Sequence, residues 1–125
     1  MDTRGVVKIS YFYSNYFGGR FQTAGVSLFI QPADKFMFIP KVEWVGESFE
    51  DAIRQGVLDG FKDIDLDINQ GISVQLTDII NHEIDSSWKS FYMAARIAIR
   101  TRKDIIELHK NIPSKYEFGH RPEKE

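Results

Sequence analysis

Alternating apolar and polar residues predict four β-strands in this chain. Residues 6–13, VVKISYFY, are rich in β-branched and aromatic residues, which favour strands. Residues 24–31 and 72–76 carry apolar side chains at every second position, as a half-buried strand does. The remaining candidate strand, residues 36–45, lies between these two in the sequence. Pro40 within it indicates an edge strand or a bulge.

Two segments change to a helical period. Ser48 is a candidate N-cap, with Asp51 at the capping-box position, and apolar residues then follow at helical spacing, which predicts a helix over 49–61. A second period starts at Ser86 and predicts a helix that extends to about residue 110. The polar residues 113–125 are expected to form a poorly ordered tail.

The resulting order, β-β-β-α-β-α, defines the expected fold class. We expect an α+β, two-layer α/β sandwich, a four-stranded sheet with both helices on one face. The residues expected to be buried between the helices and the sheet are Phe49, Ile53, Val57, Phe91, Ala95 and Ala98. The first three strands, joined by short connections, are expected to form an antiparallel meander. The other face of the sheet must then be solvated or covered by a partner. Residues 1–112 are expected to form a single domain.

Composition narrows the classes of function. The chain has 125 residues, of which 42% are hydrophobic, enough for one core. Its formal net charge is -2, whereas a nucleic-acid binder usually has a basic excess, so contact with RNA would rest on a local patch. Without cysteine there is no disulfide or cysteine metal site. Lacking a signal peptide or a long apolar run, the chain is expected to be cytoplasmic, without membrane contact.

Two connections imitate ligand-binding loops. FGGRFQTAG, around Gly18 and Gly19, lacks the Lys-Ser/Thr ending of a phosphate loop and joins two strands, so we expect a hairpin loop and no nucleotide. DIDLDINQG resembles the start of a calcium loop. Counting from Asp63, however, Ile68 takes the glycine position and Val74 takes the bidentate glutamate position. We therefore expect no metal and no cofactor.

The segment NHEIDSS, residues 81–87, allows two interpretations. His82, Asp85 and Ser86 are the residue types of a hydrolase triad, but neighbours in one loop rarely reach triad geometry. No G-x-S-x-G elbow is present. A helix start is favoured, in which Asp85 or Ser86 caps free N–H groups as a structural helix cap. That interpretation leaves His82 unexplained.

Charged residues collect in two regions. On the second helix, a stripe of bases is expected to be a solvated face, with a phosphate contact as the alternative; its members are Lys89, Arg96, Arg100 and Lys103. Residues 43–67 contain eight acids against the two bases Arg54 and Lys62, a local charge of about -6. Such a surface would repel RNA and must face away from it or toward a basic protein.

The end of the predicted fourth strand resembles domain IV of translation elongation factor G. In that family a strand runs into a loop of the type D-G-x-Y-H-x-V-D-S-S, followed by a helix with the pattern x-x-A-F-x-x-A-x-x-x-A. The segment GISVQLTDIINHEIDSSWKSFYMAARIAI follows these spacings without a gap. The residues that fall at them are Asp78, His82, Glu83, Ile84, Asp85, Ser86, Ser87, Phe91 and Ala95.

Two upstream segments extend the resemblance in the same order. GGRFQTAGV is similar to the family's G-G-R-G-Q-Y-G-x-V loop, and SFEDAIRQGV is similar to the helix with Y-I-P-A-V-x-x-G-I. Together the three matches cover most of residues 18–100. The corresponding residues are Gly18, Gly19, Arg20, Gln22 and Val26 in the loop, and Phe49, Ala52, Ile53, Gly56 and Val57 in the helix.

The resemblance implies a left-handed βαβ crossover, an exception to the usual handedness. In the family the two matching loops lie together at the tip of the domain, which enters the A site of the small ribosomal subunit during translocation. Ribosome-protection proteins use a related domain in a similar place. By resemblance, the loop tips at 18–24 and 78–85 would bind the ribosome or structured RNA. The implied RNA- or ribosome-binding residues are Gly18, Gly19, Arg20, Gln22, Asn81 and His82.

The chain departs from the family pattern at the tip. Ile79 stands where the family has glycine after the loop Asp, and Asn81 stands where it has tyrosine. Phe21 replaces a glycine, and Thr23-Ala24 replaces Tyr-Gly. The GTPase domain of the family is absent from this sequence. The expectation is a stand-alone domain IV that could not couple GTP hydrolysis to movement.

Three functions follow from these observations. The first is a ribosome- or RNA-binding module that uses Arg20, Gln22 and His82. The second is a protein–protein interaction module that kept the fold and lost RNA binding, which the net charge and the altered tip favour. The third, a hydrolase using His82 and Ser86, is disfavoured, and we expect no enzymatic activity.

Overall fold

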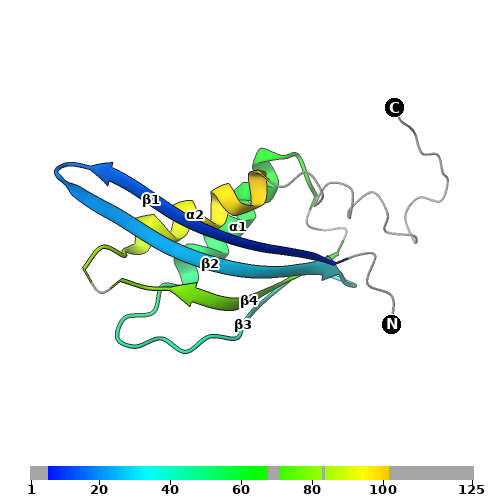
Figure 1. The fold of residues 1–125 in the computed structure, drawn as a ribbon. Helices are drawn as coiled ribbons and strands as arrows, with labels where there is room; N and C mark the ends of the chain where they lie inside the picture. Colours follow the sequence, from blue (N-terminus) through cyan, green and yellow to red (C-terminus); the bar gives the residue numbers. More distant parts are fainter. Residues whose placement is uncertain (1–5, 68–70, 83, 102–125) are drawn as a thin grey trace.

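The structure, a computed structural model, describes residues 6–67, 71–82 and 84–101. The elements follow the predicted order (Figure 1). They are β1 (Val7–Phe17), β2 (Arg20–Pro32), β3 (Met37–Pro40), α1 (Glu50–Asp63), β4 (Ile72–Ile80) and α2 (Trp88–Arg100). The predicted continuation of the second helix to residue 110 and the polar tail lie outside the described residues.

The four strands form one mixed sheet in the order β1-β2-β4-β3. β1 pairs antiparallel with β2, β2 pairs antiparallel with β4, and β3 pairs parallel with β4. The predicted meander is therefore wrong, because the longer β4 takes the place beside β2. The short β3 ends at Pro40, which has no N–H to donate, and it forms the edge strand that this proline indicated.

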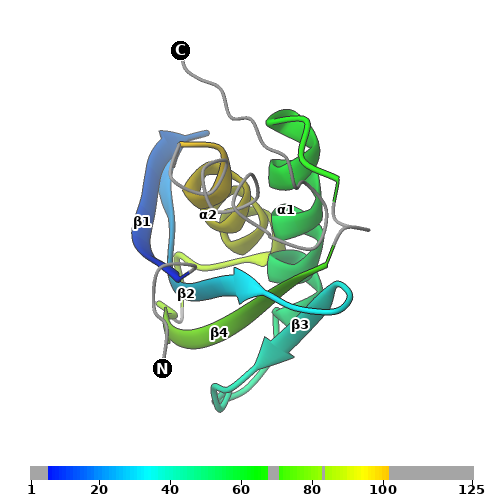
Figure 2. The ribbon, with the colours of Figure 1, turned by 90° about the vertical axis from the view of Figure 1, so that its right-hand side faces the viewer.

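β3, α1 and β4 form a parallel crossover unit. When the sheet is viewed from its helix-covered side with the parallel strands pointing upward, β4 lies to the left of β3 (Figures 1 and 2). The crossover through α1 is therefore left-handed, as the resemblance implies. Parallel connections of this kind are otherwise almost always right-handed.

The hairpin of β1 and β2 is longer than predicted. Residues 14–17 and 20–23, expected as a loop, are strand residues, and the turn consists of Gly18 and Gly19 alone. Their φ angles are +65° and +84°, which suits a two-residue type I′ turn and would strain most other residues. Aromatic residues on both faces of this hairpin hide the alternation that would have predicted these strand ends.

Both helices cover one face of the sheet, which confirms the two-layer sandwich (Figure 2). Of the residues predicted to lie between the layers, five are fully buried: Ile53, Val57, Phe91, Ala95 and Ala98. Phe49 is half-buried, because it precedes α1 and stacks its ring on that of Phe91. From the sheet, the core receives alternate residues of the strands: Val7, Ile9, Val26, Leu28, Ile30, Ile72, Val74 and Leu76.

The helix–helix contact requires small residues on α1. A Cβ added at Gly56 would lie 2.4 Å from the carbonyl oxygen of Tyr92, and one at Gly60 would lie 2.7 Å from Cβ of Ile99. These distances are shorter than any normal contact, so a larger residue could not be accommodated at either position without moving α2. Spaced four residues apart, the two glycines lie on one side of α1 and let the backbones approach.

Charged side chains link the same two helices. The Arg96 guanidinium donates from Nε to the Asp63 carboxylate at 2.7 Å, and Arg100 lies 3.6 Å from it. The hydrogen bond from Arg96 lowers the pKa of Asp63. Tyr92 donates its hydroxyl to Asp59, and this bond raises the Tyr92 pKa. Two members of the predicted basic stripe, Arg96 and Arg100, thus pair with α1, while Arg100 and Lys89 remain exposed.

Candidate nucleic-acid interface at the hairpin tip

Two segments that are far apart in sequence meet at one end of the sheet. The β1–β2 turn and the connection from β4 to α2 lie on the same side of the molecule (Figure 1). Arg20 donates from Nη2 to the carbonyl oxygen of Ile84 at 3.0 Å, which joins them directly. Arg20 and His82 are both exposed, as expected. Gly18, Gly19 and Asn81 are exposed as well, whereas Gln22 is half-buried.

Ser86 ties the β4–α2 connection to β2. Its hydroxyl donates to the carbonyl oxygen of Thr23 at 2.7 Å and accepts the N–H of His82 at 2.8 Å. The Thr23 N–H also donates to the carbonyl oxygen of Asp85 at 3.0 Å. The connection therefore continues the hydrogen bonding along β2 past the end of β4. These bonds hold the His82 backbone beside the hairpin.

The helix cap is Ser87, so the prediction that Asp85 or Ser86 caps α2 is wrong. Ser87 has the extended backbone of an N-cap, with φ -155° and ψ 174°, and its hydroxyl accepts the Ser90 N–H. The Ser90 side chain accepts the Ser87 N–H in return, which completes a capping box. The Ser86 hydroxyl cannot serve the helix because it is already bonded to the neighbouring backbone.

Ser48 is likewise not the N-cap of α1. The N-cap is Phe49, which makes no side-chain capping bond, although the Ser48 hydroxyl accepts the Glu50 N–H at 3.3 Å. Glu50 and Asp51 instead place two carboxylates in the first turn, where they favour the positive end of the helix dipole. The first helix therefore starts at Glu50.

The α2 cap provides the first prediction. Replacing Ser87 by Ala should lower the free energy of unfolding by about 1 kcal/mol, because the Ser90 N–H loses its acceptor. Urea denaturation followed by circular dichroism measures this change. Asp85→Ala is the matched control and should change stability by less than about 0.5 kcal/mol. An equal loss in both variants would show that Ser87 is not the residue that starts the helix.

Exposed aromatic rings surround the tip on the outer face of the sheet. Tyr16 and Phe21 form an edge-to-face pair with ring centroids 5.1 Å apart, and their exposed fractions are 62% and 53%. Phe12 is 45% exposed, and its ring lies 6.1 Å from that of His82. Sequence reasoning did not select Phe12 or Tyr16. The strand phase could have found them, because both alternate with the core residues of β1.

A β-bulge decides which β4 residues join this surface. Leu76 lies opposite Leu28, but Asp78 lies opposite the preceding residue Ser27, so Thr77 is extra. The Thr77 hydroxyl donates to the Ser27 carbonyl oxygen at 3.2 Å. After the bulge, the alternation of β4 is shifted by one residue.

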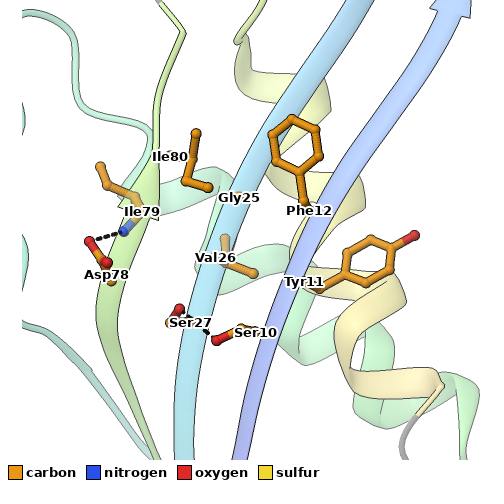
Figure 3. Close-up of a pocket in the computed structure, with 9 residues that line it drawn as sticks. All are labelled: Ser10, Tyr11, Phe12, Gly25, Val26, Ser27, Asp78, Ile79 and Ile80. Carbon is orange, nitrogen blue, oxygen red and sulfur yellow. Dashed lines mark hydrogen bonds between the residues drawn. The ribbon is translucent and has the colours of Figure 1, made fainter.

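Ile79 and Ile80 take opposite faces as a result. Ile79 pairs with the buried Val26 and is half-buried, so it packs against the core on the helix side of the sheet. Ile80 is exposed on the outer face, where it covers Gly25 next to Phe12 (Figure 3). A Cβ at Gly25 would lie 2.8 Å from Cβ of Ile80, so the glycine makes room for this side chain.

The described residues bear on the metal, hydrolase and membrane alternatives. There, no three His, Asp or Glu side chains come together as a metal site would require. The Ser86 hydroxyl, which would be the nucleophile of a hydrolase, accepts the backbone N–H of His82 and donates to the Thr23 carbonyl oxygen. Within that same part of the chain, no helix is long and apolar enough to span a membrane.

The fold and this end of the sheet define a class of structure. The chain is an α+β, two-layer sandwich with strand order β1-β2-β4-β3. Its tip is formed by the β1–β2 turn and the β4–α2 connection. No family model matches the sequence. Among solved structures, it is similar to the crystal structure of ttk003000868 from Thermus thermophilus, with a TM-score of 0.68 and 24% identity over 77% of this chain. The chain spans 15% of the length of that protein, and this similarity concerns the fold alone.

Proposed function

We propose that this chain is a non-enzymatic module like domain IV of elongation factor G, and that it binds the ribosome or structured RNA through its tip. The observation that carries the proposal is the 3.0 Å hydrogen bond from Arg20 to the Ile84 carbonyl oxygen. It joins the two segments whose motifs resemble the tip loops of that domain. The fold brings these two segments into contact, and the sequence motifs alone do not show that contact.

The chemistry of the tip suits RNA. A guanidinium has five N–H donors, and the bond to Ile84 uses one of them, so an exposed Arg20 has further donors for phosphate oxygens. His82 can donate to phosphate or stack on a base. The exposed rings of Tyr16 and Phe21 offer faces and edges for unpaired bases.

Two of the acidic residues, Asp59 and Asp63 at the C-terminal end of α1, do not oppose this proposal. Asp59 and Asp63 face α2, where Tyr92, Arg96 and Arg100 bind their carboxylates. The end of α1 that carries them points away from the hairpin tip (Figure 1). RNA at the tip would therefore meet Arg20 before it met these two carboxylates.

Co-sedimentation with ribosomes at two salt concentrations tests the proposal. The native chain should pellet with ribosomes at low salt and much less at high salt, because phosphate contacts release counterions. The double variant Arg20→Ala, His82→Ala should weaken binding roughly tenfold or more through lost charge-assisted hydrogen bonds. Its melting temperature should fall only slightly, since both side chains are exposed and only the exposed hydrogen bond from Arg20 to Ile84 is lost.

Arg54→Ala is the matched control. It removes the same positive charge from an exposed position on α1, so it should leave ribosome binding unchanged. Equal loss of binding in the control and in the double variant would mean that net charge, not the tip, causes binding. Absence of binding by the native chain even at low salt would contradict the proposal.

A protein-interaction module is the second candidate function. The exposed side chains of Phe12 and Ile80, close together on the outer face of the sheet, favour it. Apolar contact with a protein would depend little on salt, unlike contact with phosphate. Ribosome binding that survives high salt and is lost in Ile80→Ser would therefore favour docking on a ribosomal protein.

A further inference from the structure

The two edges of the sheet differ in how well they are protected from pairing. β3, at one edge, has four residues and ends at Pro40, two features that prevent strand addition. β1, at the other edge, has eleven residues, and in the described part of the chain it pairs only with β2. From Ile9 to Phe17 it contains no charge, proline or glycine. Such an edge is a template for another strand.

The hairpin turn determines which backbone groups this edge presents. In a two-residue turn the flanking residues, Phe17 and Arg20, form a hydrogen-bonded pair, and such pairs alternate along an antiparallel ladder. Odd-numbered residues of β1 therefore bond to β2. The N–H and C=O groups that point to the open edge belong to the even-numbered residues, which include Ser10, Phe12, Ser14 and Tyr16.

We propose that the β1 edge pairs antiparallel with the β1 edge of a second copy of this chain, about a two-fold axis at Phe12. This register sets like residues against like: Phe12 lies opposite Phe12 of the second copy, Ser10 opposite Ser14, and Tyr11 opposite Tyr13. Phe12 is among the residues whose backbone points outward, so the central pair is hydrogen-bonded. Aromatic–aromatic and Ser–Ser pairs are favourable across strands.

The strand that pairs with the β1 edge is assigned to a second copy of this chain because, in this register, β1 places like residues opposite each other. The pairing is isologous, so it uses the β1 edge of both copies and closes at two chains. The edges left over are the two β3 strands, which are short and end at Pro40. The sheet would become a continuous eight-stranded sheet with the two hairpin tips at opposite ends of the shared strand pair. This proposal does not depend on RNA binding.

Single cysteines test the register, because the chain has no cysteine of its own. A hydrogen-bonded antiparallel pair has Cα atoms about 5.5 Å apart, which suits a disulfide. Phe12→Cys should therefore form a covalent dimer under mild oxidation, seen on a non-reducing gel. Ser10→Cys alone should not, whereas a mixture of Ser10→Cys and Ser14→Cys should cross-link.

Phe21→Cys is the matched control, because Phe21 is an equally exposed aromatic residue on the outer face that does not belong to the open edge. Equal cross-linking of Phe12→Cys and Phe21→Cys would reflect random collision and overturn the proposal. Cross-linking of Ser10→Cys with itself, without cross-linking of Phe12→Cys, would overturn the register.

Sedimentation of the unmodified chain tests the dimer without a cross-link. The native chain should show twice the monomer mass, with dissociation on dilution. Ser14→Pro removes an N–H of the open edge and leaves the bonds to β2 in place, so it should weaken the dimer roughly tenfold or more. Circular dichroism should show that it remains folded. A native chain that is monomeric at every concentration, or a dimer unaffected by a folded Ser14→Pro, would overturn the proposal.

Discussion

Replacing Phe91 by Ala should lower the free energy of unfolding by about 3–5 kcal/mol, the range for deleting a buried phenyl ring. Phe91 on α2 is fully buried and packs against two other aromatic rings. Its centroid lies 5.4 Å from that of Phe49 in a stacked arrangement, and 5.2 Å from that of Trp44 nearly at right angles. The cavity would thus open where α1, α2 and the β3–α1 connection meet. Urea denaturation measures the loss.

Trp88→Ala is the control for this variant. Trp88 lies on the same helix, one turn earlier, and stacks on Tyr92, but 48% of it is exposed. Its removal leaves no enclosed cavity, so the cost should be about 1 kcal/mol. A loss of stability at Phe91 no greater than that at Trp88 would show that these three rings do not form part of the core.

Replacing Gly56 by Ala should destabilise the domain by about 2 kcal/mol, although alanine favours helices more than glycine does. The added methyl group would lie 2.4 Å from the Tyr92 carbonyl oxygen and 2.9 Å from Cβ of Ala95. A backbone oxygen cannot turn away as a flexible side chain can. The helices must separate, and the loss of packing exceeds the gain of about 1 kcal/mol in helix propensity.

Gln55→Ala, at the exposed neighbouring position, separates packing from propensity. Gln55 is exposed and donates to Asp59 one turn later in α1 at 3.0 Å, so this change should stay within about 0.5 kcal/mol of the native stability. Thermal and urea denaturation of both variants provide the comparison. A stabilising effect of Gly56→Ala would mean that α1 and α2 do not approach each other as closely as described.

The sequence predicted the helices and the core well because their signals are local. Apolar residues at helical spacing identified Ile53, Val57 and Phe91 as buried, and all three are. Sheet order is not local in this way. The short connection between β2 and β3 does not show that β4, and not β3, lies beside β2. Which strand pairs with β2 depends on strand length and on the crossover through α1.

The sequence predicted where the tip residues lie in the fold, but it did not predict the hydrogen bonds of the segment between β4 and α2. The tip residues Arg20, at the start of β2, and His82, just after β4, lie at one end of the sheet, as the resemblance implied. Three adjacent serine or aspartate residues could each have capped α2. Their roles were decided by tertiary bonds, in which the Ser86 hydroxyl and the Asp85 carbonyl group bind to Thr23, 62 or more residues earlier in the chain. Spacing alone could not distinguish them from Ser87.

Thr77 is the extra residue of the β4 bulge, so its deletion would not change the pairing of the other β4 residues with β2. Shortening the strand elsewhere would turn every later side chain to the opposite face. Without Thr77, Leu76 would still face Leu28 and Asp78 would still face Ser27, as they do now. The strand would bend less, and the following connection with His82 would leave the sheet in another direction. Deletion of Thr77 is therefore a way to redirect the tip while keeping its residues on the same faces.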